Sequence, residues 1–336
     1  MPGRDIVVIG ASAGGVEALR AMVGGLPPDL PAAVLVVLHV PRSSPSALPS
    51  ILDRSGPLRA ATAADGEPLT PGRIYVAAVD HHLLIINGRV RLSRGPSENG
   101  HRPAVDPLFR SAARAYGAQA VGVVLSGSRD DGAAGLAAIV ESGGIAVVQD
   151  PADALHPSMP RSALEQVSTD HVVPAAKMGS LIAELVLANV NGAAPDSDVL
   201  AAEVAMADFA ATPTDDLGVP PAGYGCPNCG GALFEVHSAP VPRFRCRIGH
   251  AWSPDSLLEE HAVSVEGALW VALRALEEKK GLSQRMALNS QQRGHTGSAR
   301  RYRTRADEAD RAATLIRDLI ARFGSAADLE DTRLGE

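Results

Sequence analysis

The sequence contains few of the residues that nucleotide-binding loops and disulfide-rich folds require. Lysine occurs only at Lys177, Lys279 and Lys280, and no glycine is followed by lysine and then serine or threonine. This pattern excludes a P-loop and disfavours covalent chemistry on lysine. The chain has only 3 cysteines, an odd number, and all lie between Cys226 and Cys246. We therefore expect no disulfide framework.

Long hydrophobic runs and an excess of positive charge are also missing. No apolar run reaches the roughly 18 residues of a membrane span, and Met1–Asp5 does not lead into the core of a signal peptide. The formal net charge is -7 and aromatic residues make up 3% of the chain, so nothing favours binding to nucleic acid or to an anionic membrane. We expect a cytoplasmic protein, without membrane insertion, whose partners are proteins or small molecules.

The rest of the composition is that of a globular protein, with 46% hydrophobic and 21% charged residues. Residues 4–188 alternate short apolar runs with helical patterns, which predicts an α/β fold with a doubly wound, mostly parallel, Rossmann-like sheet. The predicted strands are Ile6–Ile9, Ala33–Leu38, Ile74–Ala77, Ala120–Leu125 and Ile145–Val148. Helices are expected after Ala13 and Ala133, and Leu83–Leu92 predicts an antiparallel hairpin that turns at Asn87-Gly88.

The pattern changes near Asn189, so more than one domain is expected. The expected parts are an α/β domain at 1–188, a flexible Ala-, Pro- and Asp-rich linker at 189–223, a small Cys/His module at 224–254, a helical hairpin at 255–325 and a disordered tail at 326–336. The first hairpin helix repeats apolar residues at spacings of three and four, which gives one apolar stripe. The hairpin either folds back on its own domain or forms the seam of a homodimer.

A serine lies where the first predicted strand turns into a helix. Gly10-x-Ser12-x-Gly14 has the spacing of a nucleophile elbow, in which small flanking residues allow a sharp turn that presents the hydroxyl above the sheet. A turn whose serine caps the helix, or a phosphate loop at the helix N-terminus, would have the same spacing. A dinucleotide site is disfavoured because Gly-x-Gly-x-x-Gly is absent here.

Two further polar groups lie at the carboxyl ends of predicted strands, where open α/β sheets form their crevices. His39 ends the second strand, and Asp131 lies in the loop that follows the strand ending at Leu125. A serine nucleophile requires a base, and the base requires an orienting carboxylate. Asp130, directly before Asp131 in the same loop, is the alternative acid.

Many segments of residues 4–188 resemble, in the same order, the catalytic domain of chemotaxis protein-glutamate methylesterases of the CheB type. The matching segments are Gly10-Ala11-Ser12-Ala13-Gly14-Gly15, Leu38-His39-Val40, Pro71-Gly72-Arg73-Ile74-Tyr75-Val76-Ala77, Asp80-His81-His82-Leu83, His101-Arg102-Pro103-Ala104-Val105-Asp106-Pro107-Leu108-Phe109, Val121-Gly122-Val123-Val124-Leu125-Ser126-Gly127, Asp131-Gly132-Ala133-Ala134-Gly135 and Met159-Pro160. The resemblance implies Ser12 as nucleophile, His39 as base and Asp131 as orienting acid. It also implies hydrolysis of glutamate γ-methyl esters on the cytoplasmic helices of chemoreceptor-like proteins, with release of methanol, and deamidation of certain glutamines.

The sequence departs from the family pattern beside the implied site. Family members usually carry Gly-Met-Gly-x-Asp-Gly, whereas this chain has Ser128-Arg129 before Asp130-Asp131, and Ala13 replaces a frequent threonine. The expected oxyanion and substrate rim comprises Ala13, Ser128, Arg129, Arg102 and Asp106. We expect no counterpart of the family's N-terminal receiver domain, because the first predicted strand begins at residue 5 or 6, and hence no control by phosphorylation in cis.

The Cys/His module has the ligand spacing of a closed structural zinc site. Cys226-x-x-Cys229 and Cys246-x-x-x-His250 supply three thiolates and one imidazole, which use every cysteine of the chain. His237, His261 and His171 are weaker alternatives to His250. A closed site leaves no position for substrate, so Zn²⁺ is expected to support folding, and no cofactor is expected for catalysis.

Two other functions remain compatible with the sequence. The serine hydrolase could act on a different acyl substrate, because fold and triad do not determine substrate. Alternatively, the chain could be a catalytically idle scaffold that binds methylated receptors or a methyltransferase. Intact Ser12, His39 and Asp131 favour an enzyme.

Overall fold

The computed structural model describes residues 3–42, 46–190, 197–210, 220–236 and 242–333, with side chains described up to residue 322. It divides into two compact units, one ending at Leu257 and the other beginning at Leu258. Among the described residues, no helix combines the length and the apolar character that crossing a membrane requires.

The first unit is built on a seven-stranded parallel sheet with the strand order β3-β4-β2-β1-β7-β8-β9. The strands are β1 Ile6–Ala11, β2 Ala33–Leu38, β3 Arg59–Thr62, β4 Arg73–Val76, β7 Ala120–Val124, β8 Ile145–Gln149 and β9 Val172–Val173. Every residue of β1, β2 and β7 is buried. The apolar runs in the sequence therefore form the interior strands, because strands covered on both faces require apolar side chains throughout.

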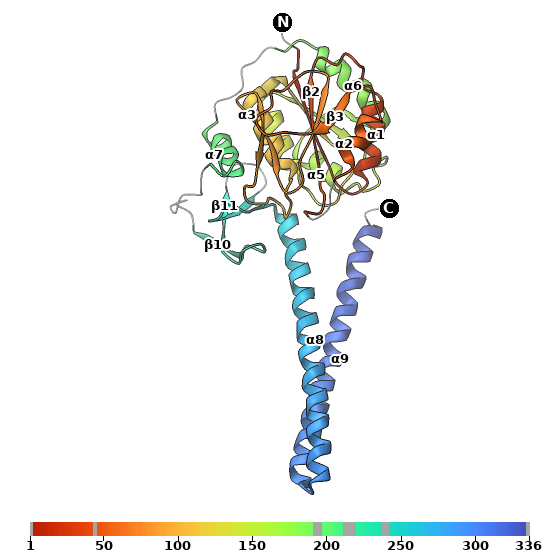
Figure 1. Cartoon of the computed structure of the whole chain (residues 1–336), viewed down its shortest axis with the longest axis vertical. Coiled ribbons are helices and arrows are strands. Elements are labelled where there is room, and N and C mark those ends of the chain that lie inside the picture. Colours follow the sequence, from red (N-terminus) through yellow and green to blue (C-terminus); the bar gives the residue numbers. More distant parts are fainter. Residues whose placement is uncertain (1–2, 43–45, 191–196, 211–219, 237–241, 334–336) are drawn as a thin grey trace. The chain divides into compact units, whose positions relative to one another are not determined.

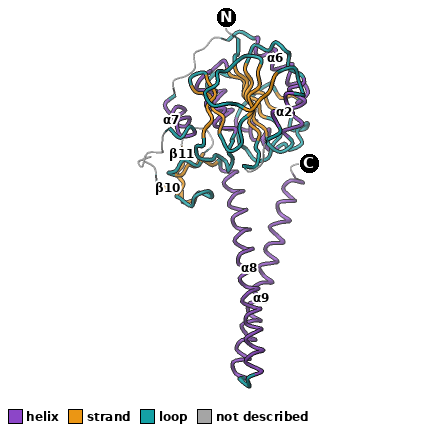
Figure 2. Tube along the Cα trace, in the orientation of Figure 1, coloured by secondary structure: helices purple, strands orange, loops and turns teal. Residues whose placement is uncertain are grey.

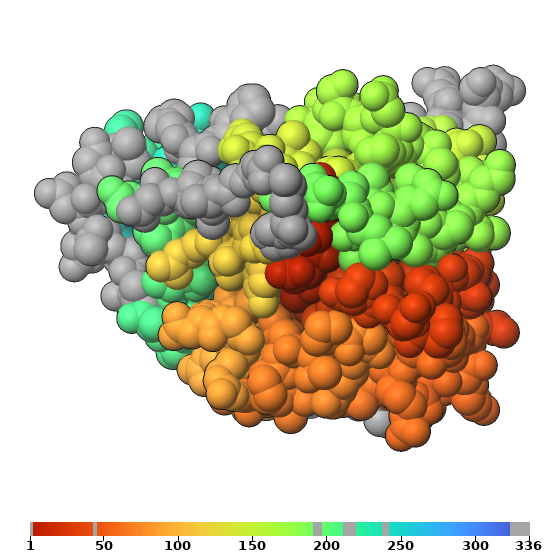
Figure 3. Space-filling view, turned by 90° about the horizontal axis from the view of Figure 1, so that it is seen from above, coloured from red at the N-terminus to blue at the C-terminus, as the bar shows by residue number. Residues whose placement is uncertain are grey.

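Helices cover both faces of this sheet, which confirms the doubly wound α/β fold (Figure 2). One core includes α1 Gly15–Gly24, α2 Leu48–Asp53 and α6 Ala175–Leu187; the other includes α3 Val105–Tyr116, α4 Ala133–Glu141 and α5 Ser158–Gln166. Figure 3 shows the red N-terminal segment beside the green segment around α6. A short 3-10 turn, Gly117–Gln119, connects α3 to β7. Strand β1 pairs with β2 on one side and β7 on the other, so the chain changes direction across the sheet at β1.

Two smaller elements complete the α/β domain. The expected hairpin is confirmed as β5 His82–Ile86 and β6 Arg89–Ser93, which pair antiparallel. Helix α7, Asp198–Ala207, lies inside the stretch predicted as a flexible linker. Ser197 caps it by accepting a hydrogen bond from the Leu200 N–H, and α7 packs against α3. The rest of that stretch, 191–196 and 211–219, lies outside the described residues.

The Cys/His module forms a four-stranded antiparallel sheet, which we call the ribbon and define as residues 221–252. Its strands are β10 Pro221–Gly225, β11 Ala232–Val236, β12 Arg243–Cys246 and β13 Ala251–Trp252, in that spatial order. A small core of Leu233, Trp252 and Leu257 supports it. The ribbon belongs to the same compact unit as the α/β domain.

The second unit is a hairpin of two long helices. Helix α8, Pro254–Gln292, begins at the end of the first unit, and α9, Thr296–Arg333, follows it (Figure 1). Lys280 of α8 pairs with Asp310 of α9 at 2.6 Å, and small residues such as Ala287 and Ala309 are buried. Helix α9 continues to Arg333, well into the segment expected to be a disordered tail, and residues 334–336 lie outside the described chain. The homodimer seam stays a prediction.

Candidate active site

Ser12 follows β1 directly, at a turn that glycine makes possible. Gly14 has a φ of 68°, a left-handed conformation that glycine adopts without strain. The Ser12 N–H donates to the Ser126 carbonyl at 2.9 Å, and the Gly15 N–H donates to the Ser12 carbonyl at 2.9 Å. A Cβ on Gly127 would lie only 2.9 Å from the Ser12 Cβ. The loop after β7 therefore lies against Ser12.

His39 lies next to Ser12 because β1 and β2 pair in parallel. Ala11 pairs with Leu38 in this register, so Ser12 and His39 occupy the next position on each strand. The His39 N–H donates to the Ala11 carbonyl at 3.1 Å. His39 Nε2 lies 2.7 Å from Asp131 Oδ2, while buried Nδ1 has no hydrogen-bond partner within the described part of the chain. With the Nε2 proton donated to Asp131, Nδ1 is the nitrogen left to accept a proton.

Asp131 lies in a site that favours its ionised form. Oδ2 accepts the Val105 N–H at 2.7 Å, and Oδ1 accepts the Asp106 N–H at 3.2 Å and Asn99 Nδ2 at 3.1 Å. Burial alone raises the pKa of Asp131, but the hydrogen bond and charge of His39 and the Val105 N–H outweigh burial and keep that pKa well below the usual carboxyl range. The carboxylate is therefore fixed in position beside His39.

The neighbouring acid, Asp130, points elsewhere. Its Oδ1 accepts the Ser253 hydroxyl at 2.8 Å and the Ser256 hydroxyl at 2.6 Å. Burial raises the pKa of Asp130, and the two serine hydrogen bonds act against that rise. Of the two carboxylates considered from the sequence, the structure thus brings Asp131, and not Asp130, to His39.

Two residues outside the expected site lie directly against this pair. His101 stacks on His39 with ring centroids 3.7 Å apart and an angle of 9° between the planes. Burial, with the adjacent His39, lowers the pKa of His101 to about 3, so its ring is neutral at physiological pH. Asn99 donates to Asp131 and is 3% exposed. Neither residue lies at the end of a strand. Both are placed at the site by contacts with residues distant in the sequence, which a local pattern does not show.

The five expected rim residues occupy different environments. Asp106 is 2% exposed, and its Oδ1 accepts the N–H groups of Gly132 and Gly135 at 3.1 and 2.7 Å, so it lies beneath the Asp131 loop and not on a rim. Burial and the charge of Asp131 raise the pKa of Asp106 to about 7. Of the other four, Arg102 pairs with Asp80 at 2.8 Å, and the Ala13 carbonyl accepts the Ser126 hydroxyl at 2.8 Å. Ser128 is exposed, and Arg129 is half-buried with a φ of 66°.

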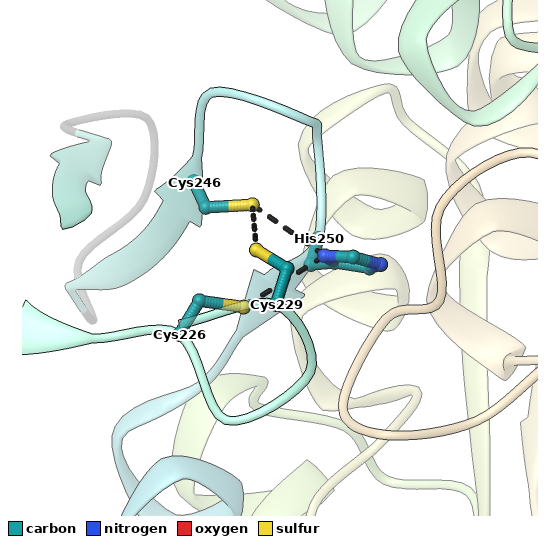
Figure 4. A group of neighbouring side chains, drawn as sticks. All are labelled: Cys226, Cys229, Cys246 and His250. Atoms are coloured by element: carbon teal, nitrogen blue, oxygen red, sulfur yellow. Dashed lines mark hydrogen bonds between the residues drawn. The ribbon is translucent and has the colours of Figure 1, made fainter. Parts of the chain in front are cut away.

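The ribbon brings together the ligand set that the sequence predicts. One ligand atom from each of Cys226, Cys229, Cys246 and His250 lies within 4.8 Å of all the others (Figure 4). The Cys229 and Cys246 sulfurs are 3.7 Å apart, and His250 Nδ1 lies 3.5 Å from the Cys246 sulfur. Tetrahedral ligands at about 2.3 Å from zinc would lie about 3.7 Å from one another. The residues therefore fit one Zn²⁺ ion. Of the alternatives to His250, residue 237 is outside the described chain.

Residues 7–182, just over half of the chain, match the family model of the CheB methylesterases. The chain belongs to the CheB methylesterase family. The match contains Ser12, His39 and Asp131 and ends before the ribbon. In this CheB-family chain, residues 183–336 therefore lie outside the region that the family model matches.

Curated relatives and a solved structure agree with this assignment. A protein-glutamate methylesterase/protein-glutamine glutaminase of Anaeromyxobacter dehalogenans is 41% identical over 54% of this chain and 53% of its own length. One from Methanosarcina mazei is 36% identical over 54% of this chain and 52% of its own length. The CheB methylesterase catalytic domain of Thermotoga maritima is 35% identical with a TM-score of 0.53, and the match covers 55% of this chain and 100% of that domain. The chain spans about half the length of the curated relatives it matches.

Proposed function

We propose that this CheB-family chain is a serine esterase that hydrolyses glutamate γ-methyl esters. The observation that carries the proposal is the 2.7 Å hydrogen bond between His39 and Asp131, with Ser12 at the strand position next to His39. A nucleophile, a base and an orienting acid at the carboxyl ends of a parallel sheet are the groups that acyl transfer requires. The names of the curated relatives support the choice of substrate.

In the proposed reaction, the Ser12 hydroxyl attacks the ester carbonyl while His39 Nδ1 accepts its proton. Asp131 orients the imidazole and stabilises its cation. The C–O bond to the methoxy group then breaks, and His39 donates its proton to the departing methanol. Water attacks the acyl-enzyme with His39 again as base, which regenerates the Ser12 hydroxyl and releases a glutamate carboxylate. The Ala13 N–H, directly after the nucleophile, is a donor for the oxyanion, and such a donor contributes about 3 kcal/mol to transition-state stability.

The proposed substrates are methylated glutamates on the cytoplasmic helices of chemoreceptor-like proteins. Deamidation of glutamine follows from the same steps, with ammonia in place of methanol as the leaving group. The glutaminase part of the relatives' names supports this second reaction.

Methanol release from a methylated receptor cytoplasmic fragment tests the proposal. The intact chain is expected to release methanol, and Ser12→Ala is expected to release at least about 10⁴-fold less, because removing a triad nucleophile leaves only binding and oxyanion contributions. Release that is equal in both proteins would contradict Ser12 as nucleophile. If the intact chain releases none, the substrate is a different acyl group or the chain is a scaffold.

We also propose that Cys226, Cys229, Cys246 and His250 bind one structural Zn²⁺. The ligand spacing and the tetrahedral distances support this assignment. Metal analysis is expected to give one zinc per chain and less than about 0.1 for Cys229→Ser, since loss of one thiolate from a four-ligand site strongly weakens binding. Hydrogen exchange in residues 221–252 is expected to speed up on chelation. Unchanged exchange after complete metal removal would show that the ribbon folds without zinc.

A further inference from the structure

The ribbon lies directly on the segment that leads to the active site, Pro96–His101. Asn228, between the first two cysteines, donates from its side chain to the Ser97 hydroxyl. Gly249, beside His250, lies so close to Pro96 that a Cβ on the glycine would be 2.8 Å from Pro96 Cγ. Both ligand-bearing turns of the ribbon therefore contact Pro96–His101.

Backbone pairing joins the two segments further. The Ala251 N–H donates to the Ser97 carbonyl at 3.3 Å, and the Asn99 N–H donates to the Ala251 carbonyl at 2.8 Å. Glu98 and Ala251 form a parallel bridge. Ala251 directly follows His250 in the sequence. The backbone of Asn99 is thus hydrogen-bonded to the residue that directly follows the last metal ligand.

The Asn99 side chain connects Ser253, the residue directly after the ribbon, to the two carboxylates of the site. Its Oδ1 accepts the Ser253 N–H at 2.9 Å. Its Nδ2 donates to Asp131 Oδ1 at 3.1 Å and to Asp106 Oδ2 at 3.3 Å. Asn99 is buried, with a φ of 50°, a conformation that asparagine adopts more readily than most residues. Both polar atoms of the Asn99 side chain are therefore hydrogen-bonded, Oδ1 to Ser253 and Nδ2 to the two carboxylates.

A second contact joins Ser253, directly after the ribbon, to Asp130, the residue before the orienting acid Asp131. Ser253 donates its hydroxyl to Asp130 Oδ1 at 2.8 Å, so its N–H and its hydroxyl contact Asn99 and Asp130 respectively. Asp130 precedes Asp131 in the loop after β7. His101, two residues after Asn99, stacks on His39. Ser253, directly after the ribbon, thus contacts Asp130 and Asn99, which are the sequence neighbour and a hydrogen-bond partner of Asp131.

We propose that Asn99 is a positioning residue through which the folded ribbon orients Asp131, so that turnover depends on an intact ribbon metal site. The proposal rests on the proposed function, in which Asp131 orients His39. Asn99 does not touch substrate in this account; it acts by fixing the Asp131 carboxylate. An enzyme that lost the ribbon fold would keep Ser12, His39 and Asp131 but lose the Ser253 and Ala251 contacts that place Asn99.

The test measures methanol release and the downfield proton resonance of the His39–Asp131 hydrogen bond in four full-length proteins: intact, Asn99→Ala, Cys229→Ser and the double variant. Loss of a hydrogen bond to a charged group corresponds to about a 10–100-fold effect. Asn99→Ala is therefore expected to lower kcat by about 10–100-fold with KM within about 2-fold. Cys229→Ser is expected to lower kcat similarly, and the double variant to lie within about 3-fold of Cys229→Ser alone, because both changes remove one interaction.

Asn87→Ala is the matched control. Asn87 has a φ of 51° in the exposed β5–β6 turn, so it has the backbone conformation of Asn99 without its contacts. Its kcat is expected to stay within about 2-fold of the intact value. A kcat loss equal to that of Asn99→Ala would show that the effect comes from the backbone and would overturn the positioning role.

The two readouts separate failure of this inference from failure of the proposed function. If the intact chain releases methanol but Asn99→Ala and Cys229→Ser turn over normally and keep the downfield resonance, the positioning role is wrong. Multiplicative effects in the double variant would also overturn it. If no protein releases methanol, yet the resonance of the intact chain is broadened or lost in both single variants, the positioning role stands and the substrate assignment fails.

Discussion

Asp131→Asn is expected to lower kcat for ester hydrolysis by about 10³–10⁴-fold, because an amide that replaces the orienting carboxylate favours the wrong imidazole tautomer. In the structure, Asp131 Oδ2 accepts the Nε2 proton of His39 at 2.7 Å, which leaves Nδ1 free to act as base. An amide nitrogen facing Nε2 would stabilise the opposite tautomer, in which Nδ1 carries the proton. Steady-state kinetics of methanol release measure the effect.

Asp130→Asn is the matched control for this prediction. An asparagine oxygen at position 130 still accepts the hydroxyls of Ser253 and Ser256, which Asp130 Oδ1 accepts at 2.8 and 2.6 Å. We expect kcat to change by less than about 5-fold, since an exchange that keeps these hydrogen bonds and does not touch His39 has a small effect. Equal losses in both variants would contradict the assignment of Asp131 as the orienting acid.

Arg110→Ala is expected to lower the free energy of unfolding of the first unit by about 3–5 kcal/mol, because it removes one of the arginines that neutralise two buried carboxylates. Arg110 lies 2.5 Å from Glu98 and 3.0 Å from Glu203, and all three side chains are almost fully buried. Arg243 of the ribbon joins the same cluster, at 2.8 Å from Glu203. Urea unfolding followed by the fluorescence of buried Trp252 measures the change.

The same cluster makes stability depend on pH. Burial raises the pKa of Glu98, but Arg110 and the ribbon arginines outweigh burial and keep it below the usual range. A carboxyl whose folded-state pKa is lowered stabilises the fold above its unfolded-state pKa, and the stabilisation is lost as the pH falls. We therefore expect stability to fall below about pH 4.5, and to fall less steeply in Arg110→Ala, which lacks one of the charges that lower the pKa of Glu98.

Exposed Arg114, on the same helix, provides the control Arg114→Ala, which is expected to change stability by less than about 0.5 kcal/mol. Identical unfolding curves for the two variants would contradict a stabilising role of the cluster.

The interior of the α/β domain follows from the sequence because its strands are apolar on both faces. Strands β1, β2 and β7 contain almost only apolar residues, and each strand ends close to the residue that the pattern predicts. The edge strands β3, Arg59–Thr62, and β9, Val172–Val173, were not predicted. The first is largely exposed and the second has only 2 residues, so neither shows the hydrophobic pattern of a buried strand.

The positions of the candidate site residues follow partly from the sequence. Ser12 and His39 stand at ends of paired strands, so local patterns suffice to place them side by side. Asn99 and His101 belong to a segment whose position depends on the ribbon and on Asp131, which are distant in the sequence. Helix α7 was predicted as linker because its stretch is rich in alanine, proline and aspartate and shows little periodicity, although the Ser197 cap is a signal that a search for helix starts could find.

Labelling with a serine-directed fluorophosphonate, mapped by mass spectrometry, tests the central claim most directly, because it detects an activated Ser12 without any assumption about substrate. We expect one phosphonate per chain on the peptide containing Ser12, no label in Ser12→Ala and slow labelling in Asp131→Asn. Exposed Ser128, in the loop after β7, provides an internal comparison and is expected to stay unmodified. A folded chain that takes up no label, or takes it up at Ser128 in place of Ser12, would contradict the role of Ser12 as nucleophile.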